Sequence, residues 1–225
     1  MSEKRAQFIA ISPSLIHYGS YKEERLTLDL RWFSLIEALG YAPLVLPFSR
    51  EWKKLFDSVE VIGLILSGGN NLACTESNEL SVKRDEFETY FLQYAIEKYV
   101  PILGICRGMQ FINHYFGGSL KEVLGHVNRR HHVQIHPNSI LFNTLGSVAY
   151  LNSFHHYGIS QLPKELLPLA WASDDLSIEA FLHYQRPILG LLWHPERFKE
   201  GSINYKKHIE LLNSFFSNNL PPVNL

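Results

Sequence analysis

PILGICRGMQFINHYF, residues 101–116, is the stretch from which the fold can be argued. Its apolar opening predicts a buried strand over 101–105, and Met109 to Phe116 predicts a helix. Between them, Gly104-Ile105-Cys106-Arg107-Gly108 has the form G-x-C-x-G. Glycines two places before and after a nucleophile permit the sharp strand-to-helix turn that lifts its side chain into a cleft. The segment therefore predicts a cysteine nucleophile on such a turn, although a buried cysteine beside a glycine-rich turn is the alternative from these residues alone.

The apolar run Val61–Leu66 ends abruptly in Ser67-Gly68-Gly69-Asn70, which predicts a second buried strand that runs into a glycine turn. If this strand neighbours the cysteine strand, glycine backbone can lie close to a scissile carbonyl. We expect the amides of Gly69 and Arg107 to form an oxyanion hole, since the amide after the nucleophile usually works with one from a neighbouring loop. An ordinary strand-ending turn is the alternative.

Near the other end of the chain, LLWHPE, residues 191–196, closes another predicted strand with a histidine and a carboxylate. A cysteine nucleophile needs an imidazole to take its proton and return it to the leaving amine, and the imidazole needs a carboxylate to fix its tautomer. We expect His194 and Glu196 to have these roles. By itself the His194-Pro195-Glu196 sequence is weak evidence for these roles, because Glu196 could simply cap a helix.

The remaining segments alternate between strand and helix patterns, which predicts an α/β fold of flavodoxin-like type: a mostly parallel central sheet with helices on both faces. The length of 225 residues suits a single domain over 1–225. The region from Gly117 to Ala149 has no clear pattern, and Asn218–Leu225 is expected to be a loose tail. The strand-like runs are Phe8–Ile11, Ala42–Leu46, Val61–Leu66, Ser177–Tyr184 and Ile188–Trp193, the last two paired; the helix-like segments are Glu24–Leu39, Glu51–Phe56, Val82–Tyr99 and Tyr205–Phe216.

Composition excludes several classes of protein. Lys and Arg total 21 against 22 Asp and Glu, a balance that argues against a nucleic-acid or anionic-membrane surface. The apolar run near the N-terminus is too short for a signal peptide and no later run approaches a membrane span, so a cytoplasmic protein is expected. Two cysteines, Cys74 and Cys106, are too few for a disulfide framework.

The chain has 11 histidines, and their crowding raises the question of a metal site. There is no H-E-x-x-H helix and no cysteine-histidine pairing of zinc type, so we expect neither a metal nor a cofactor. His155 and His156 are as consistent with hydrogen-bonded structural histidines as with substrate contacts. The crowded positions are His126, His131, His132, His136, His155 and His156.

Taken together, the cysteine turn, the glycine pair and the His-Pro-Glu end resemble the class I glutamine amidotransferase superfamily, in its γ-glutamyl hydrolase (peptidase C26) branch. Gly117-Gly118-Ser119-Leu120, residues 152–159 and Ile178-Glu179-Ala180 extend the likeness over most of the chain. The resemblance implies a thioester mechanism in which Cys106, His194 and Glu196 are catalytic and Gly69 and Arg107 serve the oxyanion. It also implies a set of residues around the glutamyl group of a small-molecule substrate: Gly68, Gln110, Asn152, Ser153, Phe154, His155 and His156.

A narrower likeness concerns the leaving group. Residues 21–25, 83–85 and 106–110 resemble the subgroup that hydrolyses γ-glutamyl-CDP-amidate in capsule phosphoramidate synthesis. Asn70-Asn71 departs from the aspartate that hydrolases of this branch often have there, which leaves open a γ-glutamyl-γ-aminobutyrate-type hydrolase. The sequence is also consistent with a glutaminase subunit that delivers ammonia to a separate synthase, or with a non-catalytic binding protein. It does not decide the oligomeric state.

Overall fold

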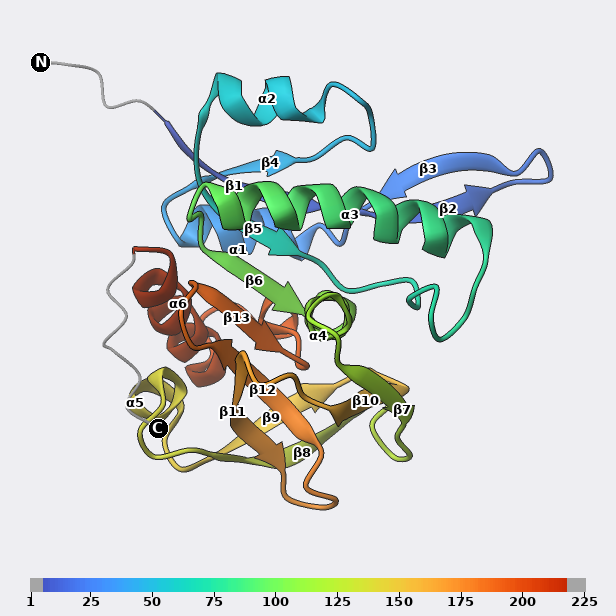
Figure 1. Ribbon diagram of the computed structural model, residues 1–225. Helices are drawn as coiled ribbons and strands as arrows, with labels where there is room; N and C mark the ends of the chain where they lie inside the picture. Colours follow the sequence, from blue (N-terminus) through green and yellow to red (C-terminus); the bar gives the residue numbers. More distant parts are fainter. Residues whose placement is uncertain (1–5, 218–225) are drawn as a thin grey trace, which may run out of the picture.

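A nine-stranded sheet forms the centre of the computed structural model, which describes residues 6–217 (Figure 1). Its strand order is β4-β1-β5-β6-β13-β12-β11-β8-β9. The tail expected at residues 218–225 lies outside the described residues. The strands are β1 (Gln7–Ser12), β4 (Ala42–Val45), β5 (Glu60–Leu66), β6 (Ile102–Ile105), β8 (Arg129–Ile135), β9 (Val148–Ser153), β11 (Leu166–Ala172), β12 (Ile178–His183) and β13 (Ile188–Leu191).

The sheet has a parallel and an antiparallel half. Strands β4, β1, β5, β6 and β13 pair in parallel, and the sheet then continues through β12, β11, β8 and β9 by antiparallel pairing. Helices cover both faces, so the predicted α/β class is confirmed (Figure 1). The helices are α1 (Arg31–Ala38), α2 (Trp52–Ser58), α3 (Glu79–Glu97), α4 (Arg107–Tyr115), α5 (Ile140–Leu145) and α6 (Ile203–Phe216).

Alternating strand residues divide the core between the two faces, because successive side chains of a strand point to opposite sides. Ile9, Ile65 and Leu103 pack on the face covered by α1, α5 and α6. Their neighbours Ala10 and Leu64 pack on the opposite face, against α2, α3 and α4. The parallel strands are thus buried on both sides, which is why they read as continuous apolar runs in the sequence.

The predicted helix over Glu24–Leu39 is wrong in its first part. Residues Glu23–Thr27 form strand β3, which pairs with β2 (Ser14–Tyr18) in a two-stranded sheet beside α3. The helix begins only at Arg31. The apolar stripe that a helix could bury starts at Leu28, whereas Glu23–Arg25 are exposed and gain nothing from lying on the sheet.

The region without a clear pattern holds β7 (Ser119–Glu122), β8, α5 and the first residues of β9. Strand β7 pairs with β10 (Tyr157–Gln161), and β8 with β9 and β11, so each strand has partners distant in the sequence. Such pairings leave little local signal. Over residues 6–217, no helix has both the length and the apolar character that a membrane crossing needs.

Candidate active site

Cys106 lies on a strained turn between β6 and α4. Its φ is 52° and its ψ is −105°, an unfavourable region for a residue with a side chain. The turn is anchored because the amide of Cys106 donates to the carbonyl oxygen of Leu191 in β13 at 2.8 Å. The side chain is 8% exposed. Strain of this kind at the end of a strand is typical of a residue that must project into a cleft.

The two glycines that flank Cys106 are needed for close packing of the turn. A Cβ atom at Gly108 would lie 2.0 Å from the carbonyl oxygen of Leu66, and one at Gly104 would lie 2.8 Å from the backbone of Gly108. The positive φ falls on the cysteine itself. The glycines therefore let α4 approach β5 and β6, and this approach imposes the turn on Cys106.

The glycine pair after β5 faces Cys106. A Cβ atom at Gly68 would lie 2.9 Å from Cε1 of His194 and 3.7 Å from Cβ of Cys106, so the backbone of Gly68 lies against both. The carbonyl oxygen of Gly68 accepts hydrogen bonds from Ser14 Oγ and Arg84 Nη1, each at 3.1 Å. Because a trans peptide directs its N–H opposite to its C=O, the Gly69 amide points away from Arg84.

His194, three residues after the end of β13, is held by its ring and by its backbone. Its Nδ1–H donates to the carboxylate of Glu196 at 2.6 Å. Its peptide N–H donates to Asn152 Oδ1 at 2.8 Å, and its carbonyl oxygen accepts from Asn152 Nδ2 at 2.9 Å. Burial would lower the pKa of His194, but the charges of Glu196 and of the Cys106 thiolate raise it to about 9. The imidazole therefore favours its charged form beside the sulfur.

A buried group of charges under the turn connects these parts. Glu88, in α3, accepts from Arg84 Nε at 2.9 Å and is paired with Arg107, the residue after the cysteine. Asp85 also pairs with Arg107. Burial lowers the pKa of both guanidinium groups, a cost that the two carboxylates offset. Arg84 and Asp85 thus occupy structural roles, and α3 holds both the glycine loop and the cysteine turn.

Two cavities lie near His194, which lines the first, whereas its contacts Asn152 and Phe154 line the second. One, of about 290 Å³, is lined by Gly68, Gly69, His194 and Glu196 together with residues of the β2–β3 hairpin and α1. The other, of about 530 Å³, shares Arg197 with the first and is strongly basic. Its arginines come from distant parts of the chain, so apart from the adjacent pair at 129 and 130 no local pattern predicts it. It is lined by Arg31, Asn128, Arg129, Arg130, Tyr150, Asn152, Phe154 and Arg197.

Several residues expected around the glutamyl group have other partners. Asn152 holds the backbone of His194, and Ser153 Oγ donates to the carbonyl oxygen of His126 at 2.6 Å. His155 is buried with its Nδ1 3.1 Å from the carbonyl oxygen of Tyr157, and His156 is exposed. Neither Ser153 nor His155 lines the two cavities described above, and their contact with a substrate stays a prediction.

Gln110 lies one helical turn after Cys106, whose carbonyl oxygen accepts from the Gln110 amide at 3.1 Å, and Phe154 lies beside His194. Gln110 Nε2 donates to the carbonyl oxygen of Tyr157 at 2.7 Å, which leaves its side-chain oxygen available. The ring of Phe154 packs edge-on against His194, with 5.7 Å between centroids, and Arg197 lies over its face at 4.4 Å. Phe154 thus separates the imidazole from the basic cavity.

A second cluster of ionisable groups lies apart from these cavities. His126, His131 and Glu179 are buried, and their ligand atoms all lie within 4.8 Å of one another. Burial would raise the pKa of Glu179, but the imidazoles of His126, His131 and His155 hold it well below its usual range. Although the sequence spacing predicts no metal, this donor set is one that could hold a metal ion.

Comparisons with known proteins show the family to which the chain is similar. A family model described as Peptidase C26 matches residues 8–196. A gamma-glutamyl-CDP-amidate hydrolase of Campylobacter jejuni is 34% identical over 213 residues, which cover 93% of this chain and 98% of that protein. A glutamine-hydrolyzing GMP synthase subunit of Archaeoglobus fulgidus is 31% identical over 155 residues, or 68% of this chain and 76% of that protein.

Among solved structures, a glutamine amidotransferase from Thermotoga maritima has the same arrangement of helices and strands. The TM-score is 0.64, and the match covers 98% of this chain and 88% of that one at 17% identity. At this identity the likeness is one of fold.

Proposed function

Because the chain belongs to the Peptidase C26 family, we propose that Cys106, His194 and Glu196 are the catalytic triad of a γ-glutamyl amide hydrolase. At the coarser level, the chain is a glutamine amidotransferase-like hydrolase. The main support for this triad is that Cys106 and His194 both lie against the backbone of Gly68. Glu196 in turn fixes the imidazole of His194 through a hydrogen bond of 2.6 Å.

The first half of the reaction is acylation of the enzyme. The Cys106 thiolate attacks the γ-carbonyl carbon, and the carbonyl oxygen becomes an oxyanion that accepts hydrogen bonds from the amides of Gly69 and Arg107. In the described part of the chain neither amide has another acceptor. When the C–N bond breaks, protonated His194 gives its proton to the leaving nitrogen, and a γ-glutamyl thioester is left on Cys106.

The second half is hydrolysis of the thioester. Neutral His194 takes a proton from water, the hydroxide attacks the thioester carbon, and the C–S bond breaks to return the thiolate and release glutamate. Glu196 stabilises the imidazolium in both halves. Gln110 is the proposed contact of the glutamyl group, through its free side-chain oxygen.

The arginines of the basic cavity favour a substrate whose leaving group carries phosphate. Arginine forks bind phosphate oxygens in pairs. Of the cavity's arginines, Arg31 and Arg129 are paired with aspartates, whereas Arg130 has no ion-pair partner within residues 6–217. Together with the similarity to the Campylobacter hydrolase, this favours γ-glutamyl-CDP-amidate, which would be cleaved to CDP-amidate and glutamate.

The test is to follow glutamate release from glutamine, γ-glutamyl-γ-aminobutyrate and γ-glutamyl-CDP-amidate by the purified protein. Strong cleavage of one non-glutamine amide is expected. Cys106→Ala should reduce it by about 10⁴-fold or more, since it removes the nucleophile. Cys74→Ala is the matched control, because Cys74 is exposed and outside the cleft. Full activity of Cys106→Ala would reject the mechanism.

The leaving group is tested separately. Arg130→Gln should raise the KM for γ-glutamyl-CDP-amidate by about 10-fold, the cost of one charged contact, and leave the KM for an uncharged γ-glutamyl amide unchanged. Arg50→Gln, at an exposed arginine that lines neither cavity, is the control. Equal KM values for Arg130→Gln and wild type would place the diphosphate elsewhere.

A second function is favoured by the similarity to the Archaeoglobus GMP synthase subunit. In that case the protein would be a glutaminase subunit that passes ammonia to a separate synthase. Weak turnover of glutamine alone, rising strongly when a synthase is added, would support it, whereas cleavage of a non-glutamine amide by the isolated chain would not.

A further inference from the structure

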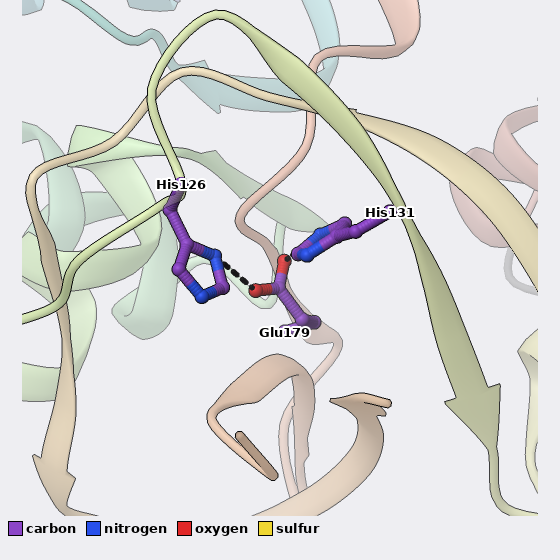
Figure 2. A group of neighbouring side chains, drawn as sticks. All are labelled: His126, His131 and Glu179. Carbon is purple, nitrogen blue, oxygen red and sulfur yellow. Dashed lines mark ion pairs between the residues drawn. The ribbon is translucent and has the colours of Figure 1, made fainter. Parts of the chain in front are cut away.

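Four segments of the antiparallel half bring a cluster of imidazoles around one buried carboxylate. His126 lies before β8, His131 in β8, His155 between β9 and β10, and Glu179 in β12. Figure 2 shows the rings of His126 and His131 turned toward the two oxygens of Glu179. These residues line neither of the cavities beside His194. The cluster is therefore distinct from the proposed catalytic site.

The facing atoms of this cluster have no hydrogen-bond partner within residues 6–217. They are His126 Nδ1, His131 Nε2, His155 Nε2 and both carboxylate oxygens of Glu179, all buried. Unpartnered polar atoms at such a density are unusual, because each one costs free energy on folding. Their convergence on one space is the pattern expected of ligands arranged around an ion.

The separations between these atoms support that interpretation. His126 Nδ1 and His155 Nε2 are each 3.5 Å from Glu179 Oε1, and His131 Nε2 is 3.7 Å from Oε2. Hydrogen bonds of this type are about 2.7–3.2 Å long. Two ligands of a tetrahedral zinc ion, each about 2.1 Å from it, lie about 3.4 Å apart. The observed gaps are thus too long for hydrogen bonds and close to those of zinc ligands.

Two of the three remaining ring nitrogens are arranged to fix the tautomers, whereas His131 Nδ1 has no hydrogen-bond partner within residues 6–217. His126 Nε2 lies 3.2 Å from the carboxylate of Asp175, and His155 Nδ1 lies 3.1 Å from the carbonyl oxygen of Tyr157. Since both partners only accept hydrogen bonds, the proton of each neutral ring is held on that side. The lone pairs of His126 Nδ1 and His155 Nε2 are then directed into the space beside the Glu179 carboxylate, where a metal ion would lie.

We propose that His126, His131 and Glu179 bind a structural zinc ion, with His155 as the fourth ligand. Nitrogen and carboxylate donors suit zinc, and four protein ligands leave no open position for chemistry. The ion joins segments that also support the catalytic base. Ser153 Oγ donates to the carbonyl oxygen of His126, and the amide of Leu192, two residues before His194, donates to the carbonyl oxygen of Glu179 at 2.8 Å.

The first experiment measures metal without reference to activity. The full chain is freed of metal with a chelator and titrated with Co²⁺, whose visible absorption reports tetrahedral coordination, and with Zn²⁺, followed by elemental analysis after dialysis. One ion per chain is expected. A hundredfold excess of Zn²⁺ over its Kd should raise Tm by about 5 to 10 °C. Absence of binding together with an unchanged Tm would overturn the proposal and leave a protonated histidine paired with Glu179.

Neighbouring histidines provide matched variants. His131→Gln should lose the Co²⁺ absorption and the rise in Tm, whereas His132→Gln should keep both, since His132 is exposed on the other face of β8. His155→Asn and His156→Asn form a second pair. Equal binding by His131→Gln and wild type would show that the ion binds elsewhere. If His131→Gln does not fold, the wild-type titrations still decide the question.

Discussion

His194 is fixed by contacts of its ring with Glu196 and Phe154 and by contacts of its backbone with Asn152. In the proposed mechanism His194 takes a proton from sulfur and delivers it to nitrogen, and such a base has to keep its ring in one plane. The contacts with Asn152 hold the backbone, and the contact with Glu196 holds the ring. Asn152 thus positions the backbone of His194, whereas Glu196 sets both the orientation and the charge of its ring.

The pH dependence of catalysis should report this arrangement. Because the pKa of His194 is raised to about 9, its ring stays protonated at neutral pH and loses the proton needed by the leaving amine only above about pH 9. We expect kcat/KM to fall on that alkaline limb. Glu196→Gln removes the charge that favours the imidazolium, so the limb should move to lower pH and kcat should fall by about 10²- to 10⁴-fold.

The control for this change is Glu200→Gln, at an exposed carboxylate a few residues further on. It should leave the profile as in wild type. An alkaline limb at the same pH in Glu196→Gln and wild type would show that Glu196 does not set the charge of His194.

Residue types at the proposed site can be predicted from the sequence, but their partners cannot. The G-x-C-x-G turn and the His-Pro-Glu end are local patterns, so they indicate Cys106, His194 and Glu196 directly. Asn152 is expected at the substrate, yet its amide holds His194, which is 42 residues away in the chain. A long-range hydrogen bond leaves no periodic trace in sequence.

At the scale of elements, helix α3 supports both halves of the proposed oxyanion hole. Arg84 donates to the carbonyl oxygens of Ser67 and Gly68, at 2.8 and 3.1 Å, and Glu88 neutralises both Arg84 and Arg107. Arginine and carboxylate are fully buried here, which only mutual pairing makes tolerable. The helix therefore acts on the cleft through its charges without contributing a residue to it.

Glu88→Gln should destabilise the protein by about 3–5 kcal/mol, because it leaves two buried guanidinium groups short of one negative charge. Urea unfolding measures the change. Glu86→Gln, at an exposed position of the same helix, should alter stability by less than about 0.5 kcal/mol. Similar stability of both variants would mean that the charges under the cysteine turn are screened by another group.

Elements with a local signature can be predicted, and those that depend on distant partners cannot. The buried strands around β5, β6 and β13 are continuous apolar runs, and α6 has clear helical spacing. Strand β3 reads as helix because it has few apolar residues and is held in place by pairing with β2. Strands β7 and β8 escape prediction because their partners follow much later in the chain.

For the whole molecule, one apolar cluster extends through both halves of the sheet. It includes Ile65 in β5 of the parallel half and Leu169 in β11 of the antiparallel half, both fully buried. Residues of α1 and α6 join the same cluster. From this continuity we propose that residues 6–217 fold as a single domain.

Ile65→Ala and Leu169→Ala should therefore each lower the free energy of unfolding by about 2–5 kcal/mol. Each should shift the midpoint of one common unfolding transition to lower urea concentration. The measurement is urea unfolding followed by far-ultraviolet circular dichroism and by tryptophan fluorescence, which should coincide. A transition that splits, with each substitution moving only one part, would instead indicate two independently folding units.

The anchoring of Cys106 to Leu191 has a consequence for the evolution of such chains. Cys106 directly follows β6 and His194 lies three residues after β13, and these two strands are adjacent and joined by hydrogen bonds, although α4 and the whole antiparallel half come between them in the chain. Insertions or deletions in the loops of that intervening stretch can reshape the walls of the cleft without moving the reacting atoms. Changes in the stretch of chain between Cys106 and His194 can then alter which substrate is bound, while the proposed reaction stays the same.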